Sequence, residues 1–251
     1  KKARSTMQAN LIGSNVDDAT AQYLIDTLTP AYEASKAPLV DVSSDSESPS
    51  LIKALLSVQD GVQPMIRSAL RSWQTDLFKI NTASNGHPLA ALGQAVLEQH
   101  RLIESNKLDA EMMQNFLLLL ERDYGDNEYH NAIHGADVLL SLHLFLSKTG
   151  LSKRLSKLQL LAAFLAAICH DFRHPGTTSA HEAKVMSPLA IAYSDQSVLE
   201  LHHLASVFAL LNTEGLNVLG PLSAEDFRHV RGLMIEMVLH TDLAKHFDFI
   251  G

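Results

Sequence analysis

The stretch from Leu158 to Cys169 constrains the fold more than any other feature of the chain. It spans 12 residues, is apolar on nearly every side and runs directly into His170 and Asp171. A hydrophobic span of this length is too short to cross a bilayer, and we expect it to form a buried helix. The sequence therefore predicts a domain in which other helices enclose this one.

The rest of the chain shows amphipathic runs with helical spacing and no convincing strand. Glycine or proline follows several of these runs, as expected for helix caps and breakers. Ser197 with Glu200 and Ser223 with Asp226 predict capping boxes at two later helices. We expect helices over about 50–80, 88–104, 109–122, 128–148, 157–171, 198–212 and 224–247. The predicted fold class is all-α, a compact multi-helix bundle.

Composition suggests where the main domain begins. Residues 42–50 are rich in serine and acidic residues and contain a proline, which is typical of a loop or linker. We predict a helical lead-in and polar linker over 1–50 and one main domain over 51–251. The chain begins Lys-Lys-Ala-Arg with no methionine and no apolar signal core, so we expect it to be cut from a longer protein.

Charge and cysteine content exclude several classes of function. A formal net charge of -8 argues against nucleic-acid binding, because neutralising phosphates requires clustered Lys and Arg. The single cysteine, Cys169, allows no intramolecular disulfide and indicates a reducing compartment. We therefore expect a cytoplasmic location, or the cytoplasmic face of a membrane if another part of the protein anchors it there, with no membrane insertion by this segment.

Two groups of histidines suggest a metal site. His130 and His134 are four residues apart and would share one face of a helix, and His170 and Asp171 end the buried helix. Taken alone, the first pair is more often a solvated polar face. A buried carboxylate needs a cation, so the metal is favoured at Asp171 over an ion pair with Arg173 or with His174.

These residues belong to a series of five motifs. They are Trp73-x-x-Asp76-x-Phe78, Tyr129-His130-Asn131-x-x-His134-x-x-Asp137, His170-Asp171-x-x-His174-Pro175-Gly176, Tyr193-x-Asp195-x-Ser197-Val198-Leu199-Glu200-x-His202-His203 and Thr241-Asp242-Leu243-Ala244-Lys245-His246. The series resembles the class I 3′,5′-cyclic nucleotide phosphodiesterase catalytic domain, an HD-type metal phosphohydrolase. The resemblance covers about residue 60 to Gly251.

The resemblance implies two divalent metal ions. The first, usually Zn²⁺, would be held by His134, His170 and Asp171 together with an aspartate further downstream. Asp171 would also bridge to a second ion, usually Mg²⁺ or Mn²⁺. The residues that match those holding the waters of this second ion are His174, Glu200 and Thr241.

The implied reaction is hydrolysis of a cyclic nucleotide, cAMP or cGMP, to a nucleoside 5′-monophosphate by a hydroxide that the two metals activate. His130 matches the general acid that protonates the leaving oxygen, and Tyr129 matches a residue that supports the wall of the substrate pocket. Family members often form homodimers and often carry regulatory domains upstream. The alternatives are a catalytically silent helical regulatory or scaffold module and another HD-type nucleotide phosphohydrolase.

The pattern departs from the family in three ways. Arg173 occupies a position that is often acidic, and Ser179 occupies one that is commonly Asn. We expect Arg173 to face outward or to pair with a carboxylate, because a cation facing inward would repel metal. The family's last metal-binding aspartate, its purine-binding glutamine and its base-stacking aromatic lie beyond Thr241–His246. We therefore expect the domain to be C-terminally incomplete, which leaves open whether this chain is active by itself.

Several site residues have plainer interpretations that the sequence leaves open. Glu200 could serve only as the acidic half of a capping box with Ser197. Thr241 could merely bond a backbone carbonyl near a helix end. His202 and His203 could be a pair on a helix surface, and we leave them out of the predicted site.

Overall fold

A computed structural model of the chain describes residues 62–245, and the lead-in and linker predicted over 1–50 lie outside this part. Its secondary structure is helical, and no strand occurs within residues 62–245. The α-helices are α4 (Val62–Ala69), α5 (Leu77–Ala83), α6 (Pro88–Gln99), α7 (Leu102–Ser105), α8 (Ala110–Arg122), α9 (Ala132–Lys148), α10 (Lys157–Cys169), α11 (Ser179–Lys184), α12 (Pro188–Tyr193), α13 (Val198–Leu211) and α14 (Ala224–Leu239). Two 3-10 helices are η1 (Leu151–Lys153) and η2 (Leu243–Lys245). The all-α prediction is confirmed.

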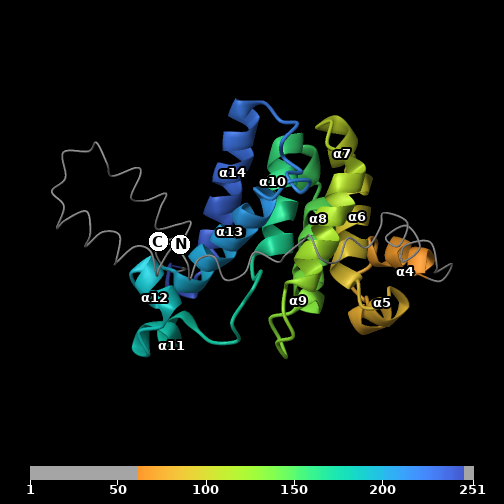
Figure 1. Cartoon of the computed structure of the whole chain (residues 1–251). Helices are drawn as coiled ribbons and strands as arrows, with labels where there is room; N and C mark the ends of the chain where they lie inside the picture. Colours follow the sequence, from red (N-terminus) through yellow and green to blue (C-terminus); the bar gives the residue numbers. More distant parts are fainter. Residues whose placement is uncertain (1–61, 246–251) are drawn as a thin grey trace.

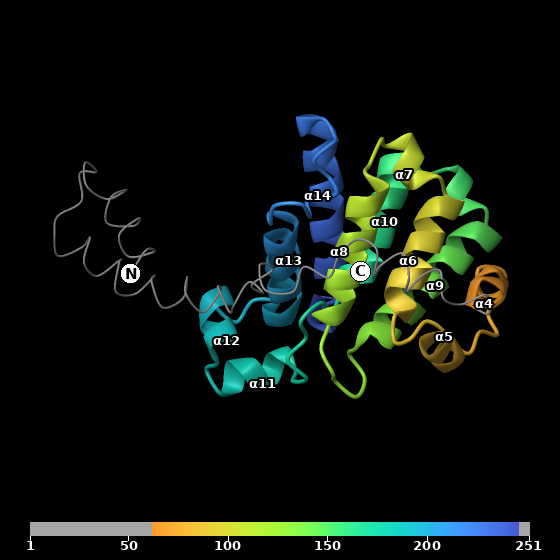
Figure 2. The same cartoon turned by 45° about the vertical axis from the view of Figure 1, so that its right-hand side comes forward.

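The apolar helix α10 lies at the centre of the bundle, as the sequence predicts. It packs against α6, α7, α9, α13 and α14, and the arrangement is visible in Figures 1 and 2. Every residue from Leu160 to Cys169 is buried. A capping box starts the helix, because Ser156 Oγ accepts from the Gln159 N–H while Gln159 Oε1 accepts from the Ser156 N–H.

Three predicted helices are shorter or more broken than expected. The run over 50–80 is interrupted between α4 and α5, where Ser72 bonds the backbone N–H of Gln74 and Asp76 caps α5. The run over 88–104 is divided at Arg101, whose φ of 53° is left-handed. The run over 224–247 ends as α14 at Leu239, and its last residues lie outside the described range.

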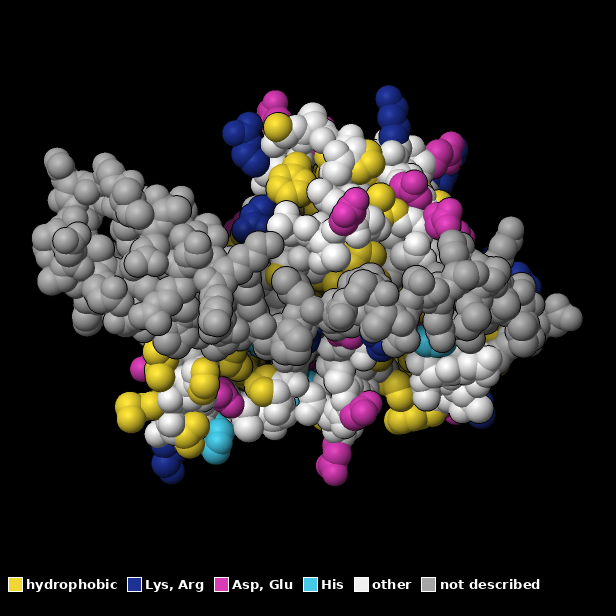
Figure 3. Space-filling model, viewed as in Figure 1, with side chains coloured by type: hydrophobic (Ala, Val, Ile, Leu, Met, Phe, Trp, Pro, Cys, Tyr) yellow, Lys and Arg dark blue, Asp and Glu magenta, His cyan; other side chains and the backbone are white. Residues whose placement is uncertain are grey.

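The segment between Gly176 and Val198 holds two helices that the sequence analysis missed. α11 and α12 are short, and side-chain oxygens of Thr178 and Ser187 cap them. Helices this short lack the long periodic pattern that identifies a helix in a sequence. Val185, Met186 and Ile191 of this region are exposed, and Figure 3 shows hydrophobic side chains gathered on its outer face.

The described helices give no sign of a membrane span. Within residues 62–245 no helix combines the length and the apolar character that crossing a bilayer needs. The boundary of the main domain at residue 51 stays a prediction, because residues 1–61 lie outside the described part.

Candidate metal centre

Helix α9 begins at the first histidine motif. Asn131 is its N-cap residue and its side-chain oxygen accepts from the N–H groups of Ile133 and His134. His134 therefore lies in the first turn of the helix. The expectation that His130 and His134 share one face of a helix is wrong, because His130 precedes the cap and belongs to the loop. Asp137 is exposed on the helix.

The end of α10 brings the second motif to the same place. His170 is the C-cap residue, and its Nδ1 lies 2.9 Å from the carbonyl oxygen of Ala167. With a proton on Nδ1, the Nε2 atom of His170 keeps a lone pair, and it lies 3.2 Å from Nε2 of His134. Asp171 Oδ2 is 3.3 Å from His134 Nε2 and 3.2 Å from His170 Nε2.

These three groups fit a metal ion. Two imidazole nitrogens and a carboxylate oxygen converge within 4.8 Å of one another. Acceptor atoms this close require a cation between them, either protons on the rings or a metal. Two histidines and a carboxylate form a donor set that zinc accepts, and three protein ligands leave room for water or substrate oxygen.

The electrostatics of the cluster also favour a cation. Burial opposes the charge of Asp171, but hydrogen bonds from His134 and His170 outweigh burial and hold the pKa of this carboxyl well below its usual range. Burial lowers the pKa of His170, and the hydrogen bond and charge of Asp171 reverse this effect, so that the pKa is raised. A negative charge is thus fixed where the three side chains meet.

A second group of potential ligands lies on the other side of the same carboxylate. Asp171, His174 and His203 place ligand atoms within 4.8 Å of one another. His203 is buried on α13, its Nδ1 lies 2.8 Å from the Phe172 carbonyl oxygen, and its Nε2 lies 3.8 Å from Asp171 Oδ1. The assignment of His203 to a helix surface is therefore wrong. Its spacing of four from the buried Leu199 was the signal that could have found it.

His174 differs from His203 in the nitrogen that carries its proton. The N–H of Gly176 donates to His174 Nδ1 at 3.0 Å, so the neutral ring carries its proton on Nε2. Burial and then the neighbouring His130 lower the pKa of His174 to about 4, which keeps the ring neutral. An Nε2–H group suits donation to a water of a hydrated ion better than direct coordination.

Glu200 and Thr241 lie near these clusters but are arranged differently. Glu200 is half-buried, and its buried Oε2 has no hydrogen-bond partner among the described residues. Burial, with the charges of Asp242 and Asp171, raises its pKa. The capping-box interpretation is wrong, because Ser197 has a left-handed φ of 40° and donates its hydroxyl to Asp242. Thr241 is exposed, and its hydroxyl donates to the Val238 carbonyl.

The first motif also supplies two rings that face the clusters. The His130 ring stacks on that of His174, with 3.8 Å between centroids and 10° between planes. The Tyr129 ring lies 4.7 Å from that of His134 and is largely exposed. All the predicted site residues except the exposed Thr241 thus contact or electrostatically influence the two clusters, whereas Arg173 pairs with Asp123 at 2.9 Å.

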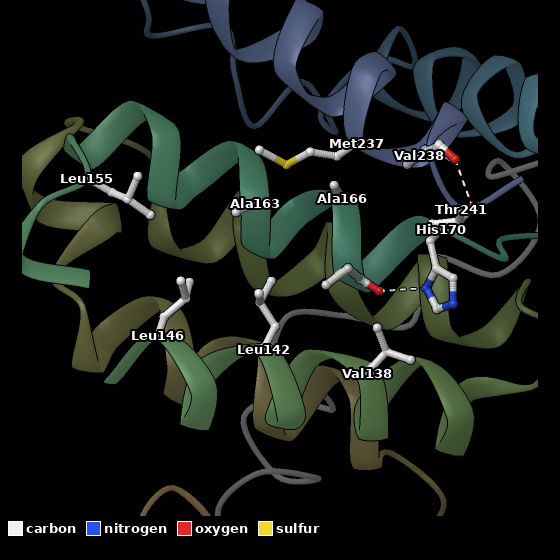
Figure 4. A pocket seen from close by; sticks show the side chains of 11 residues that line it. Val138, Leu142, Leu146, Leu155, Ala163, Ala166, His170, Met237, Val238 and Thr241 are labelled. Atoms are coloured by element: carbon white, nitrogen blue, oxygen red, sulfur yellow. Dashed lines mark hydrogen bonds between the residues drawn. The ribbon is translucent and has the colours of Figure 1, made fainter. Parts of the chain in front are cut away.

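An apolar cavity of about 360 Å³ runs between α9, α10 and α14. Val138 and Leu142 line one wall and Met237 the other, and His170 and Thr241 lie together at one end (Figure 4). A second hollow of about 530 Å³ lies beside His134 on the α5 side and includes Tyr129. The first cluster therefore borders both recesses, with His170 at the cavity and His134 at the second hollow.

Comparisons with known proteins agree with this arrangement. The profile of the family described as 3'5'-cyclic nucleotide phosphodiesterase matches residues 129–251. A human dual specificity calcium/calmodulin-dependent 3',5'-cyclic nucleotide phosphodiesterase 1B is 42% identical over 177 residues, which cover 70% of this chain and 33% of the relative. A Dictyostelium discoideum 3',5'-cyclic-AMP phosphodiesterase 4 is 34% identical over 80% of this chain and 19% of the relative.

A solved structure extends the likeness to three dimensions. The phosphodiesterase domain of the RhoPDE fusion protein from the choanoflagellate Salpingoeca rosetta matches with a TM-score of 0.67 and 30% identity. The match covers 74% of this chain and 57% of that one. The chain spans about a third of the length of the human relative. From the histidine motifs, the profile match and the shared fold, this chain belongs to the class I 3′,5′-cyclic nucleotide phosphodiesterase family.

Proposed function

We propose that this chain carries metal-dependent 3′,5′-cyclic nucleotide phosphodiesterase activity and opens the cyclic phosphate to give a nucleoside 5′-monophosphate. The observation that carries the proposal is the single carboxylate of Asp171, which has one oxygen beside His134 and His170 and the other facing His203. A carboxylate with ligands on both sides is suited to bridge two ions. Cyclic AMP and cyclic GMP are both proposed substrates.

The residues divide between two ions. His134, His170 and Asp171 would hold the first, for which zinc fits the nitrogen-rich donor set. Asp171 and His203 would face the second, with His174 and Glu200 supporting its waters, and a site with so few direct protein ligands suits Mg²⁺ or Mn²⁺, which keep several of their waters. When bound, such ions polarise the phosphate and generate a nucleophile from water at neutral pH.

His130 is the proposed general acid. Its ring lies on a loop rather than in the helix and packs against His174 at the edge of the second cluster. Breaking the bond from phosphorus to O3′ leaves an alkoxide, which needs a proton. A positioned imidazole can donate this proton and contributes typically about 100- to 10,000-fold to the rate. Tyr129 packs against the rings of His130 and His134 and is proposed to wall the substrate pocket.

The test measures turnover and metal content together. We expect the protein, loaded with Zn²⁺ and Mg²⁺, to hydrolyse cyclic AMP, cyclic GMP or both, as followed by nucleoside 5′-monophosphate release. His130→Ala should retain metal and lose about 100-fold or more in kcat. His181→Ala is the matched control, because that histidine is exposed on α11. Equal turnover by His130→Ala would remove the acid assignment.

The same experiment addresses the alternatives. Metal retention without hydrolysis of either cyclic nucleotide would favour a catalytically silent regulatory or scaffold module. Hydrolysis of nucleoside monophosphates in place of cyclic nucleotides would favour another HD-type phosphohydrolase. Homodimerisation and upstream regulatory domains remain proposals from the family resemblance, and a cytoplasmic location remains a proposal from the single cysteine.

A further inference from the structure

Asn127 connects the two loops that carry His130 and His174. Its side-chain Nδ2 donates to the carbonyl oxygen of His174 at 2.7 Å, across 47 residues of sequence, and to that of His130 at 3.3 Å. An amide nitrogen has two N–H groups, so one side chain satisfies both carbonyls. The side chains of the same two residues, His130 and His174, are the rings that stack with 3.8 Å between their centroids.

The other atoms of Asn127 are also fixed. Its backbone carbonyl accepts from Asn131 Nδ2 at 2.8 Å, and Asn131 in turn caps α9. Its Oδ1 lies so close to Gly176 that a Cβ atom added there would be 2.6 Å away. Gly176 also has a φ of 82°, which side chains with a Cβ rarely adopt. A residue with a Cβ therefore does not fit at position 176 beside the Asn127 side chain.

We propose that Asn127 is a positioning residue, which sets the distance between the His130 and His174 rings and so aims the general acid. The proposal rests on the proposed function, in which His130 donates a proton to O3′. Proton donation requires a heavy-atom separation of about 2.6–3.2 Å. A misplacement of about 1 Å can cost about 100-fold in rate. Loss of the amide would release both loops at once.

The sharpest variant is Asn127→Asp, which keeps the shape and replaces the donor by an acceptor facing two carbonyls. We expect kcat for the cyclic nucleotide to fall about 10- to 100-fold with KM and metal content little changed. Asn106→Asp is the matched control, because Asn106 also donates from a half-buried amide to a backbone carbonyl, that of Leu102, remote from the clusters. Asn127→Ala removes the donor without adding charge.

A second substrate separates positioning of the acid from damage to the metal site. Bis(p-nitrophenyl) phosphate releases an anion that needs no proton. If Asn127 acts through His130, the deficit of both Asn127 variants should largely disappear with this substrate. An equal deficit on both substrates, or no deficit on the cyclic nucleotide, would overturn the proposal.

A readout without turnover distinguishes this inference from the proposed function. Stacked rings shift each other's carbon-bound proton resonances, so we expect the NMR signals of the His130 and His174 rings to move in Asn127→Asp while those of the remote His143 stay in place. Unmoved His130 and His174 signals would refute the positioning role even in a protein that hydrolyses neither substrate. Turnover failure in the unmodified protein alone would count only against the proposed function.

Discussion

His203 Nε2 and Asp171 Oδ1 face each other at 3.8 Å, although they lie on different elements and are 32 residues apart. Burial lowers the pKa of His203 to about 3, so the ring is neutral at pH 7. Its Nδ1–H group is directed to the Phe172 carbonyl, which leaves a lone pair on Nε2. The Nε2 lone pair and the carboxylate oxygen are close enough to bind a cation between them.

We predict that His203→Ala weakens the second ion selectively. Affinity for Mn²⁺ should fall about 10- to 100-fold, because a residue beside the ion is lost, whereas zinc content should stay unchanged. Titration followed by electron paramagnetic resonance of free Mn²⁺ measures this affinity. His229→Ala, exposed on α14, is the control. Unchanged Mn²⁺ affinity would exclude His203 from the site.

Asp171→Asn should impair both sites, because one carboxylate serves both clusters. A ligand that binds only the folded state stabilises it, by about 2.7 kcal/mol when its concentration is about 100 times Kd. We therefore expect added Zn²⁺ to raise the Tm of the unmodified protein and to leave the Tm of Asp171→Asn nearly constant. An equal rise in both proteins would show that zinc binds elsewhere.

The sequence was sufficient for the fold class because α10 is apolar all round and must be enclosed. Helix boundaries were harder to predict from the sequence, since they depend on single hydrogen bonds. The first motif illustrates this limit: Asn131 caps α9 with its side chain, and this one contact removes His130 from the helix. Serine often caps helices, but the Ser197 hydroxyl donates to Asp242 instead. This tertiary contact spans 45 residues, and no local sequence pattern predicts it.

The site was predictable where ligands are adjacent in sequence and less so where packing brings them together. His170 and Asp171 end a buried helix, which marks them directly. His203 lies in an apolar helix next to another histidine, and its burial and its contacts with Phe172 and Asp171 distinguish it from that neighbour. Asn127 lies outside the sequence motifs, and its proposed role arises from hydrogen bonds to the carbonyl oxygens of His130 and of His174, 47 residues away.

Arg173→Asp tests whether this cation affects the metal centre. Arg173 Nη2 pairs with Asp123 Oδ2 at 2.9 Å in a mostly buried setting, in agreement with the expectation that it pairs with a carboxylate. Metal affinity should change little. Stability should fall by about 1–3 kcal/mol, because two carboxylates would then face each other. Urea unfolding gives the stability, and calorimetric titration with Zn²⁺ gives the affinity; a large gain in affinity would place Arg173 inward.

A pair of histidines far from the metal centre predicts a pH dependence of stability. His100 Nε2 lies 3.0 Å from His143 Nδ1, and His143 Nε2 lies 3.1 Å from the Leu70 carbonyl. Burial, then His143 and then Lys157 lower the pKa of His100 from 6.5 to about 4. Between these values the unfolded chain binds more protons than the folded one. Stability is therefore fully present above about pH 6.5 and falls as the pH drops toward 4.

His100→Gln isolates this contribution, because glutamine keeps an N–H donor and cannot titrate. Between pH 7 and pH 4.5 the unmodified protein should lose roughly 1–2 kcal/mol more than the variant, a figure that allows for the partial exposure of His100. Urea unfolding at both pH values measures the loss, and the difference between the proteins cancels the shared titration of the metal-site histidines. Parallel losses would mean that the His100 ring is protonated in the fold and that the pair with His143 is broken.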